Sequence, residues 1–113
     1  MEQQKAICNE ILSQFAGGRG ASHFRLMVGV KEVYFLPCSK NVLGGVSFTL
    51  KPCDFNDSKI NQVRVYLTPA DVYDVVFLAR NKVVKEHKGV YCDQLSDLFY
   101  EATNLYPYLG YSP

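Results

Sequence analysis

The sequence predicts an α+β protein: an antiparallel β-sheet of about five to six strands, arranged as a meander, with N-terminal and C-terminal helices packed on one face. Three observations support this fold class. Apolar residues recur at helical spacing near both ends of the chain, they alternate with polar residues in the middle, and short turn-forming segments separate the alternating runs. Strands joined by short turns pair antiparallel, and amphipathic helices can cover one face of their sheet. The 113 residues fit a single domain, residues 1–113.

The N-terminal helix is predicted over residues 3–16. Ile7, Ile11 and Phe15 recur at helical spacing and form one apolar stripe together with Leu12. Glycines at positions 17, 18 and 20 are typical of residues that end a helix. We expect the following segment to be a flexible connector and not a phosphate-binding loop, because such a loop follows a strand and opens a helix.

The apolar period changes to two at His23, which predicts the start of the sheet. Alternation over residues 24–28, 33–36, 46–50 and 63–67 predicts the first four strands. Residues 52–61, between the third and fourth of these runs, are rich in Asp, Asn and Ser. These side chains favour local hydrogen bonds to the backbone, so we expect a loop there.

The second half of the sheet and the last helix follow from the same patterns. Thr68 and Pro69 have helix-start chemistry and predict one capped turn before a fifth strand, in which Tyr73, Val75 and Phe77 share a face. A polar turn at residues 80–82 predicts a hairpin into a short sixth strand, residues 83–87, with Gly89 breaking the pattern. The C-terminal helix is predicted from a stripe that Pro107 ends, made of Tyr91, Leu95, Leu98, Phe99, Ala102 and Leu105.

Composition and charge exclude several classes of protein. With 48% hydrophobic and 20% charged residues the chain is globular, and a net charge of +1 gives no overall attraction to nucleic acid or to an anionic membrane. No apolar stretch has the length of a signal peptide or a membrane span, so we expect a cytosolic protein without a membrane partner. The four cysteines contain no C-x-x-C pair, so we expect reduced thiols, no metal site and no cofactor.

The sequence contains no catalytic signature, so we expect a protein that is not an enzyme and has no catalytic residue. Serine hydrolase, metalloprotease and Walker motifs are missing. Histidine-based catalysis would have to use His23 or His87, and both are interpreted as surface residues. Asp71 and Asp74 are three positions apart, so on a strand they would face opposite sides and could not converge on one substrate atom.

A basic run gives an alternative function. Arg80, Lys82, Lys85 and Lys88 lie in and after the predicted hairpin turn and could follow the phosphates of a single-stranded nucleic acid, with Arg64 as a further candidate for the same strip. The competing interpretation is that lysines protect the edge strand from pairing with another sheet, and the near-neutral net charge favours this one.

The C-terminal tail is the predicted partner-binding site. Tyr106, Tyr108 and Tyr111 lie within six residues, and tyrosine combines a large rigid contact area with a polar tip, as protein interfaces favour. The tail can pack back on its own domain or contact another chain, and both interpretations stay open at this stage. The tail or an open sheet edge could also pair with its copy, which would give a homo-oligomer.

Several segments resemble small uncharacterised proteins that bacteriophages and prophages encode. The similarity covers most of residues 17–106: segments 17–18, 24–31, 58–67, 71–75 and 88–95, and then Leu98, Phe99, Glu101, Thr103 and Leu105. The start of the first helix and the tyrosine-rich tail depart from the pattern. The resemblance implies a phage accessory protein that acts in the host cytoplasm, and it supplies no reaction and no site residue. The missing catalytic motifs, the compact domain and the surplus of tyrosine, taken with this setting, lead us to expect a non-enzymatic protein that binds a host or phage protein and inhibits a host defence or regulatory complex.

Overall fold

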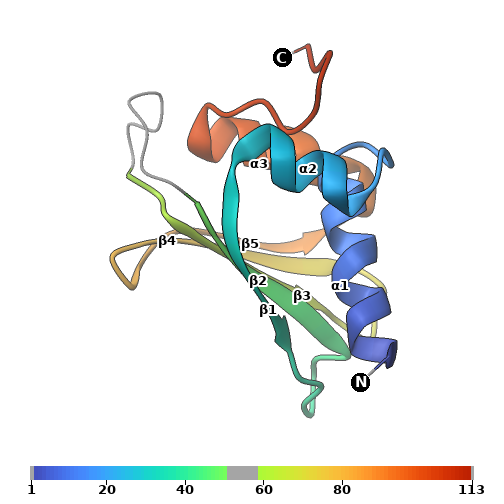
Figure 1. The fold of residues 1–113 in the computed structure, drawn as a ribbon. Helices are drawn as coiled ribbons and strands as arrows, with labels where there is room; N and C mark the ends of the chain where they lie inside the picture. Colours follow the sequence, from blue (N-terminus) through green and yellow to red (C-terminus); the bar gives the residue numbers. More distant parts are fainter. Residues whose placement is uncertain (1, 51–58, 113) are drawn as a thin grey trace.

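The computed structural model describes residues 2–50 and 59–112. Two helices come first, five strands follow, and a third helix with a short 3₁₀ turn before it completes the fold (Figure 1). The elements are α1 (Glu2–Phe15), α2 (Ala21–Val28), β1 (Val30–Leu36), β2 (Gly44–Leu50), β3 (Gln62–Leu67), β4 (Tyr73–Ala79), β5 (Lys82–Val90), η1 (Cys92–Gln94) and α3 (Leu95–Thr103).

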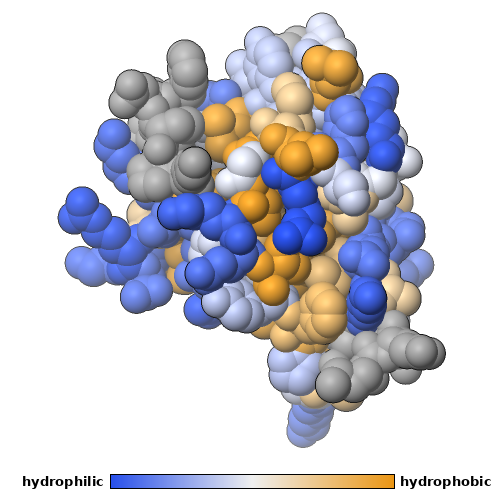
Figure 2. Space-filling view, in the orientation of Figure 1, coloured by the Kyte–Doolittle hydropathy of each residue, from blue (hydrophilic) through white to orange (hydrophobic). Residues whose placement is uncertain are grey.

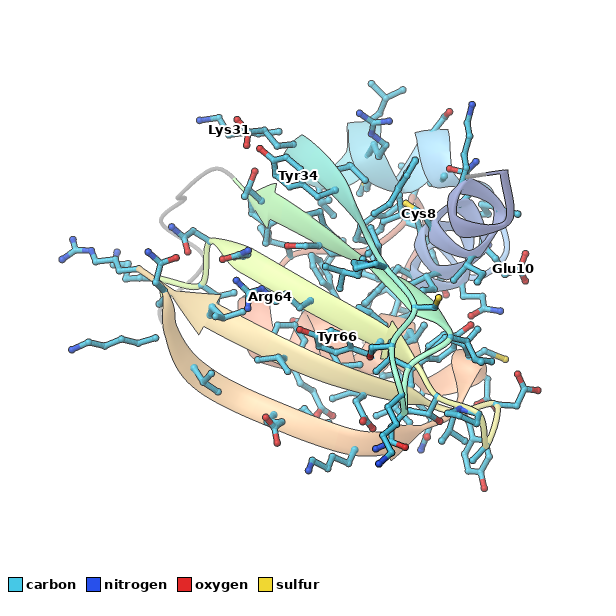
Figure 3. The ribbon with its side chains drawn as sticks, turned by 90° about the horizontal axis from the view of Figure 1, so that it is seen from below. Cys8, Glu10, Lys31, Tyr34, Arg64 and Tyr66 are labelled. Carbon is cyan, nitrogen blue, oxygen red and sulfur yellow. The ribbon has the colours of Figure 1, made fainter. Side chains whose placement is uncertain are left out.

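The five strands form one antiparallel sheet in the order β1-β2-β3-β4-β5, and the helices gather on one side of it (Figure 1). The view from below shows the other face without a helix over it (Figure 3). The predicted α+β fold class is therefore confirmed, with five strands. Gly45 allows β2 and β3 to come close together, because a Cβ at this position would collide with the carbonyl oxygen of Val65.

The core between the layers is centred on four phenylalanine rings, Phe15, Phe24, Phe48 and Phe99, which we name the phenylalanine cluster. The rings come from α1, α2, β2 and α3, and each is fully buried. Neighbouring ring centroids lie 5.2–5.8 Å apart, mostly edge to face, as aromatic pairs prefer. One ring from each of three helices thus meets the sheet at a single point.

The first predicted strand is wrong, because residues 21–28 form the helix α2. Ala21, Phe24 and Val28 are spaced to share one helical face, and Phe24 is fully buried against the core. Leu26, which the alternating pattern placed beside Phe24, is 85% exposed on the opposite side. Gly29 ends the helix in the left-handed conformation, with φ 69°. This short apolar run fits the period of a strand as well as that of a helix. The helix forms because it buries Phe24 against α1 and the sheet.

The other elements follow the prediction with local differences. Thr68 does not cap a helical turn, because its hydroxyl donates to the carbonyl oxygen of Val72 at 2.9 Å inside a non-helical turn. β5 extends past His87 to Val90 and takes in Gly89 (φ 68°) near a register shift. Tyr91 is 63% exposed and precedes η1, so the buried stripe of the last helix begins at Leu95. The predicted loop 52–61 lies largely outside the described residues.

Candidate functional site: interaction surfaces

The C-terminal tail, residues 104–112, lies back across the domain. Asn104 ends α3 in the left-handed conformation, and the chain then turns over the helices (Figure 1). The Tyr111 hydroxyl donates to Oδ1 of Asp97 at 2.6 Å, and the Leu109 N–H donates to Nε2 of His23 at 3.0 Å. The tail is thus fastened to α3 and to α2 at two separate points.

A third contact involves the glycine-rich turn between α1 and α2. The Arg19 guanidinium carbon lies 4.0 Å from the centroid of the Tyr108 ring, a cation–π geometry. Gly17 leaves room for this ring, since a Cβ there would lie 3.3 Å from Tyr108 and the residue has φ 64°. The same turn is closed by the Gly20 N–H, which donates to the Ser13 hydroxyl at 3.1 Å. The glycine-rich segment predicted as a flexible connector therefore forms the surface on which Tyr108 of the tail packs.

Four tyrosines, Tyr100, Tyr106, Tyr108 and Tyr111, form a group that we name the tyrosine cluster. Their ring centroids lie 5.3–6.0 Å apart in a connected chain of contacts. Tyr111 is buried and Tyr108 half-buried, whereas Tyr106 is 47% exposed and the neighbouring Leu109 is 72% exposed. The structure thus brings together the three tyrosines that the sequence singled out and adds Tyr100 from α3. The signal for Tyr100 was its place on α3 directly after Phe99, on the side away from the apolar stripe.

The surroundings of Tyr111 favour its neutral phenol. Burial raises the pKa of Tyr111 well above its usual value, and the hydrogen bond to the Asp97 carboxylate raises it further. Burial also raises the pKa of Tyr73 to about 12; this phenol lies outside the cluster and donates to Oε1 of Gln14 at 2.7 Å, joining β4 to α1. The phenol of Tyr111 therefore stays a hydrogen-bond donor at neutral pH.

The basic residues do not form one strip. Lys82 and Lys85 stand opposite Ala79 and Phe77, so both lie on the helix-covered side of β5. Lys88 lies 3.9 Å from the Glu86 carboxylate, and Arg80 occupies the hairpin turn with φ 52°. Arg64 lies apart from them on the central strand β3 (Figure 3). Within the parts of the chain that the structure describes, Lys88–Glu86 is the one ion pair, so Arg80, Lys82 and Lys85 have no carboxylate partner there.

Each of the two histidines makes a contact within the fold. His23 accepts the hydrogen bond of the tail, and the His87 ring lies edge-on to Phe77 with centroids 6.3 Å apart. His87 also lines an open hollow of about 640 Å³ between β5 and α3, together with Asp97 and Glu101. No hydrogen bond joins His87 to a carboxylate in residues 2–50 and 59–112, and Asp97 is engaged by Tyr111. The two aspartates considered as a catalytic pair have different surroundings. Asp71 lies in a turn, whereas the Asp74 carboxylate accepts a hydrogen bond from the Gly89 N–H at 3.3 Å.

The cysteines in the described residues are all free thiols. Burial raises the pKa of the Cys8 thiol to about 11, which makes this side chain a poor nucleophile, whereas Cys38 and Cys92 are exposed. Cys53 lies outside the described residues. Among the residues that the structure places, no three His, Cys, Asp or Glu side chains gather where they could hold a metal ion.

A second surface of interest is the edge of the sheet at β1. Leu26, Met27, Tyr34 and Phe35 are exposed large apolar or aromatic side chains on β1 and on the helix α2 beside it, and we name them the β1-edge surface. Figure 2 shows apolar side chains gathered in a band down the face where β1 lies, crossed by charged side chains. The sequence pattern missed this surface because it assigned Leu26 to a strand in the sheet.

Comparisons with protein-family models, with curated proteins and with solved structures found no match. The fold and the two surfaces therefore define the class: an α+β protein with an antiparallel meander sheet, helices on one face and aromatic side chains at its surface. None of the helices within residues 2–50 and 59–112 combines the length and the apolar character needed to span a lipid bilayer.

Proposed function

We propose that this chain is a non-enzymatic phage accessory protein that binds a host or phage protein in the host cytoplasm through the tyrosine cluster, and so inhibits a host defence or regulatory complex. The observation that carries the binding role is the clustering of four tyrosines at the surface, with Tyr106 and Leu109 exposed. The sequence resemblance supports the phage setting.

The tail is suited to recognition because it is ordered before a partner arrives. Its contacts with Asp97, His23 and Arg19 come from three different segments of the chain. A surface that is held in place loses less conformational entropy on binding than a free tail would. Tyrosine rings supply large contact area with few rotatable bonds, and their hydroxyl groups can stay in water until a partner covers them.

The test is affinity capture with the intact tagged chain from infected and uninfected host lysates, followed by quantitative mass spectrometry. We expect a discrete protein to be enriched by the wild type and lost with the double variant Tyr106→Ser/Leu109→Ser, which removes exposed side chains without touching the contacts that fasten the tail. The matched control is Tyr91→Ser, another exposed tyrosine that lies outside the cluster. The same captured proteins with wild type and double variant, or none above an unrelated bait, would contradict the proposal.

A single-stranded nucleic-acid interface remains a second candidate function, because Arg80, Lys82 and Lys85 are exposed without a carboxylate partner in the described residues. Binding by these groups would release counterions, so affinity for an oligonucleotide should fall steeply with salt, with a logarithmic slope of about 0.7 for each phosphate contacted. Lys82→Glu/Lys85→Glu should abolish it, whereas Lys31→Glu on the opposite edge strand should not. Lack of binding to oligonucleotides at low salt eliminates this candidate.

A further inference from the structure

The three contacts that fasten the tail to the domain differ in their sensitivity to protons. The Arg19 guanidinium, which lies over the Tyr108 ring, keeps its charge throughout the pH range of folded proteins. Tyr111 makes the second contact as a neutral phenol, because its pKa is raised above the usual value. In the third contact, Nε2 of His23 accepts the Leu109 N–H at 3.0 Å. Histidine ordinarily titrates between pH 5 and pH 8, so of the three contacts this one changes near neutral pH.

The chemistry of this hydrogen bond fixes the protonation state of the imidazole. The Leu109 backbone N–H can only donate, so Nε2 of His23 must present a lone pair. In the neutral ring the one nitrogen-bound hydrogen then lies on Nδ1, whereas the imidazolium carries a hydrogen on both nitrogens. Protonation would therefore place an N–H against an N–H, and no rotation of the ring would restore an acceptor. The contact can exist only while His23 is neutral.

Leu109 lies within a turn that positions two tyrosines of the tail. The Tyr111 N–H donates to the Tyr108 carbonyl oxygen at 3.2 Å, and Gly110 inside the turn has φ 91°. The rings of Tyr108 and Tyr111 contact each other, with centroids 5.3 Å apart. Because the turn is closed by its own hydrogen bond, its attachment to His23 helps to fix both rings relative to α2.

The charged side chains of the segments that meet here cannot replace the lost acceptor. Arg19 in the glycine-rich turn and Arg25 on α2 carry only donors. On α3, Asp97 already accepts a hydrogen bond from the tail, and Glu101 lines the hollow beside β5. The tail itself carries no charged side chain. Within the part of the chain that the structure describes, no carboxylate forms an ion pair with His23.

We propose that protonation of His23 detaches the turn 108–111 from α2, so that docking of the tail onto the domain responds to pH. The imidazole takes up a proton from solvent at Nε2, its hydrogen bond to the Leu109 N–H is lost, and this N–H turns to water. Detachment exposes more of the half-buried Tyr108 and of the buried Tyr111. The response of the tail is independent of what the tail binds, whereas any effect on partner capture rests on the function proposed for the tyrosine cluster.

Hydrogen exchange at the Leu109 amide, followed by NMR in the intact protein, tests the proposal. Correcting the measured rates for the intrinsic pH dependence of exchange leaves the protection factor of this amide. We expect this factor to fall by about fivefold or more between pH 8 and pH 5, as the loss of one hydrogen bond predicts. The amides of β3, the central strand of the sheet, should keep their protection. A constant protection factor at Leu109, or a fall of the same size in β3, overturns the proposal.

The two histidines provide a matched pair of variants. In His23→Gln, the side-chain amide oxygen can accept the Leu109 N–H but does not titrate, so the protection factor should stay nearly constant between the two pH values. His87→Gln removes the histidine on β5 and should keep the wild-type response. Equal responses in His23→Gln and the wild type, or a response lost in His87→Gln, would overturn the assignment to His23.

The exchange measurement needs no partner, which keeps this proposal separate from the function proposed for the tyrosine cluster. A pH response of the Leu109 amide without any captured protein would support the His23 contact while the proposed function fails. Capture of a partner without a pH response of this amide would have the opposite meaning. Where both are found, repeating the capture at pH 8 and pH 5 with the wild type and His23→Gln measures how detachment of the tail changes binding.

Discussion

Two aromatic clusters lie on opposite sides of α3, and their ring spacing is nearly the same. Neighbouring centroids are 5.2–5.8 Å apart in the phenylalanine cluster and 5.3–6.0 Å apart in the tyrosine cluster. Phe99 belongs to the first and Tyr100, the next residue, to the second. The clusters differ in burial: all four phenylalanines are fully buried, whereas the tyrosines range from the buried Tyr111 to the half-exposed Tyr106.

The hydroxyl group explains this difference and what each cluster contributes. A phenylalanine ring carries no polar atom, so complete burial leaves nothing unpaired, and such rings stabilise the contact between helices and sheet. A buried tyrosine needs a hydrogen-bond partner, which Tyr111 finds in Asp97. Tyrosines that keep their hydroxyl near water can stay both packed and accessible. The phenylalanine cluster therefore stabilises the packing of the helices on the sheet, whereas the tyrosine cluster fixes the conformation of a surface.

The sharpest test of this contrast is Phe24→Ala. This substitution removes a ring that contacts three others in a fully buried site, so we expect the free energy of unfolding to fall by about 3–5 kcal/mol. Leu26→Ala is the matched control two residues away on the same helix, and its exposed side chain should contribute less than about 0.5 kcal/mol. Urea unfolding followed by circular dichroism measures both. Similar losses for the two variants would mean that α2 does not pack as the structure shows.

The sequence predicted the fold class and the elements that carry three of the four rings of the phenylalanine cluster. Phe15, Phe48 and Phe99 lie on stripes or strands whose periodicity is unambiguous over several residues. Phe24 lies in an eight-residue segment that fits both periods, and only its packing against the other three rings makes it helical. Local pattern cannot carry that information, because the partners are distant in the chain.

The interaction surfaces were less predictable, for a related reason. The sequence located Tyr106, Tyr108 and Tyr111, but whether the tail folds back depends on Arg19, His23 and Asp97, which lie between 14 and 89 residues before their partners in the tail. The basic run illustrates the opposite case. The alternative function groups Arg80, Lys82, Lys85 and Lys88 because they are close in sequence, yet strand alternation and a bulge divide Lys85 from Lys88.

Tyr111→Phe should have an intermediate effect on stability. The ring stays in place but loses its hydrogen bond to the exposed Asp97 carboxylate, so we expect a loss of about 1–2 kcal/mol. Tyr91→Phe, with an exposed side chain, is the control and should change little. Chemical denaturation of the two variants in parallel makes the comparison. An unchanged free energy of unfolding in Tyr111→Phe would show that the tail is not fastened through this phenol.

The same phenol gives a pH dependence with a defined sign. Folding raises the Tyr111 pKa above the value of about 10 that an unfolded tyrosine has. Its contribution is therefore complete below about pH 10 and is lost as the pH rises from there toward the folded pKa. We expect the wild-type Tm to fall in this alkaline range and to fall less steeply in Tyr111→Phe. Tyr73, with its pKa raised to about 12, contributes equally to both proteins. If Tm falls with pH equally steeply in the wild type and in Tyr111→Phe, the raised pKa does not belong to Tyr111.

Tyr106→Ser should have the smallest effect on stability, and this is what makes it informative. Tyr106 is 47% exposed and forms no hydrogen bond through its side chain in the described residues, so its loss should change the free energy of unfolding by about 0.5 kcal/mol or less. An interface residue of this type can nevertheless contribute about 2 kcal/mol or more to binding a partner. If the tyrosine cluster serves recognition, Tyr106→Ser should lose partner capture and keep its stability. Phe24→Ala cannot make this distinction, because its unfolding would remove both. A large loss of stability in Tyr106→Ser would instead place the tyrosine cluster with the core, as a second means of holding α3 to the domain.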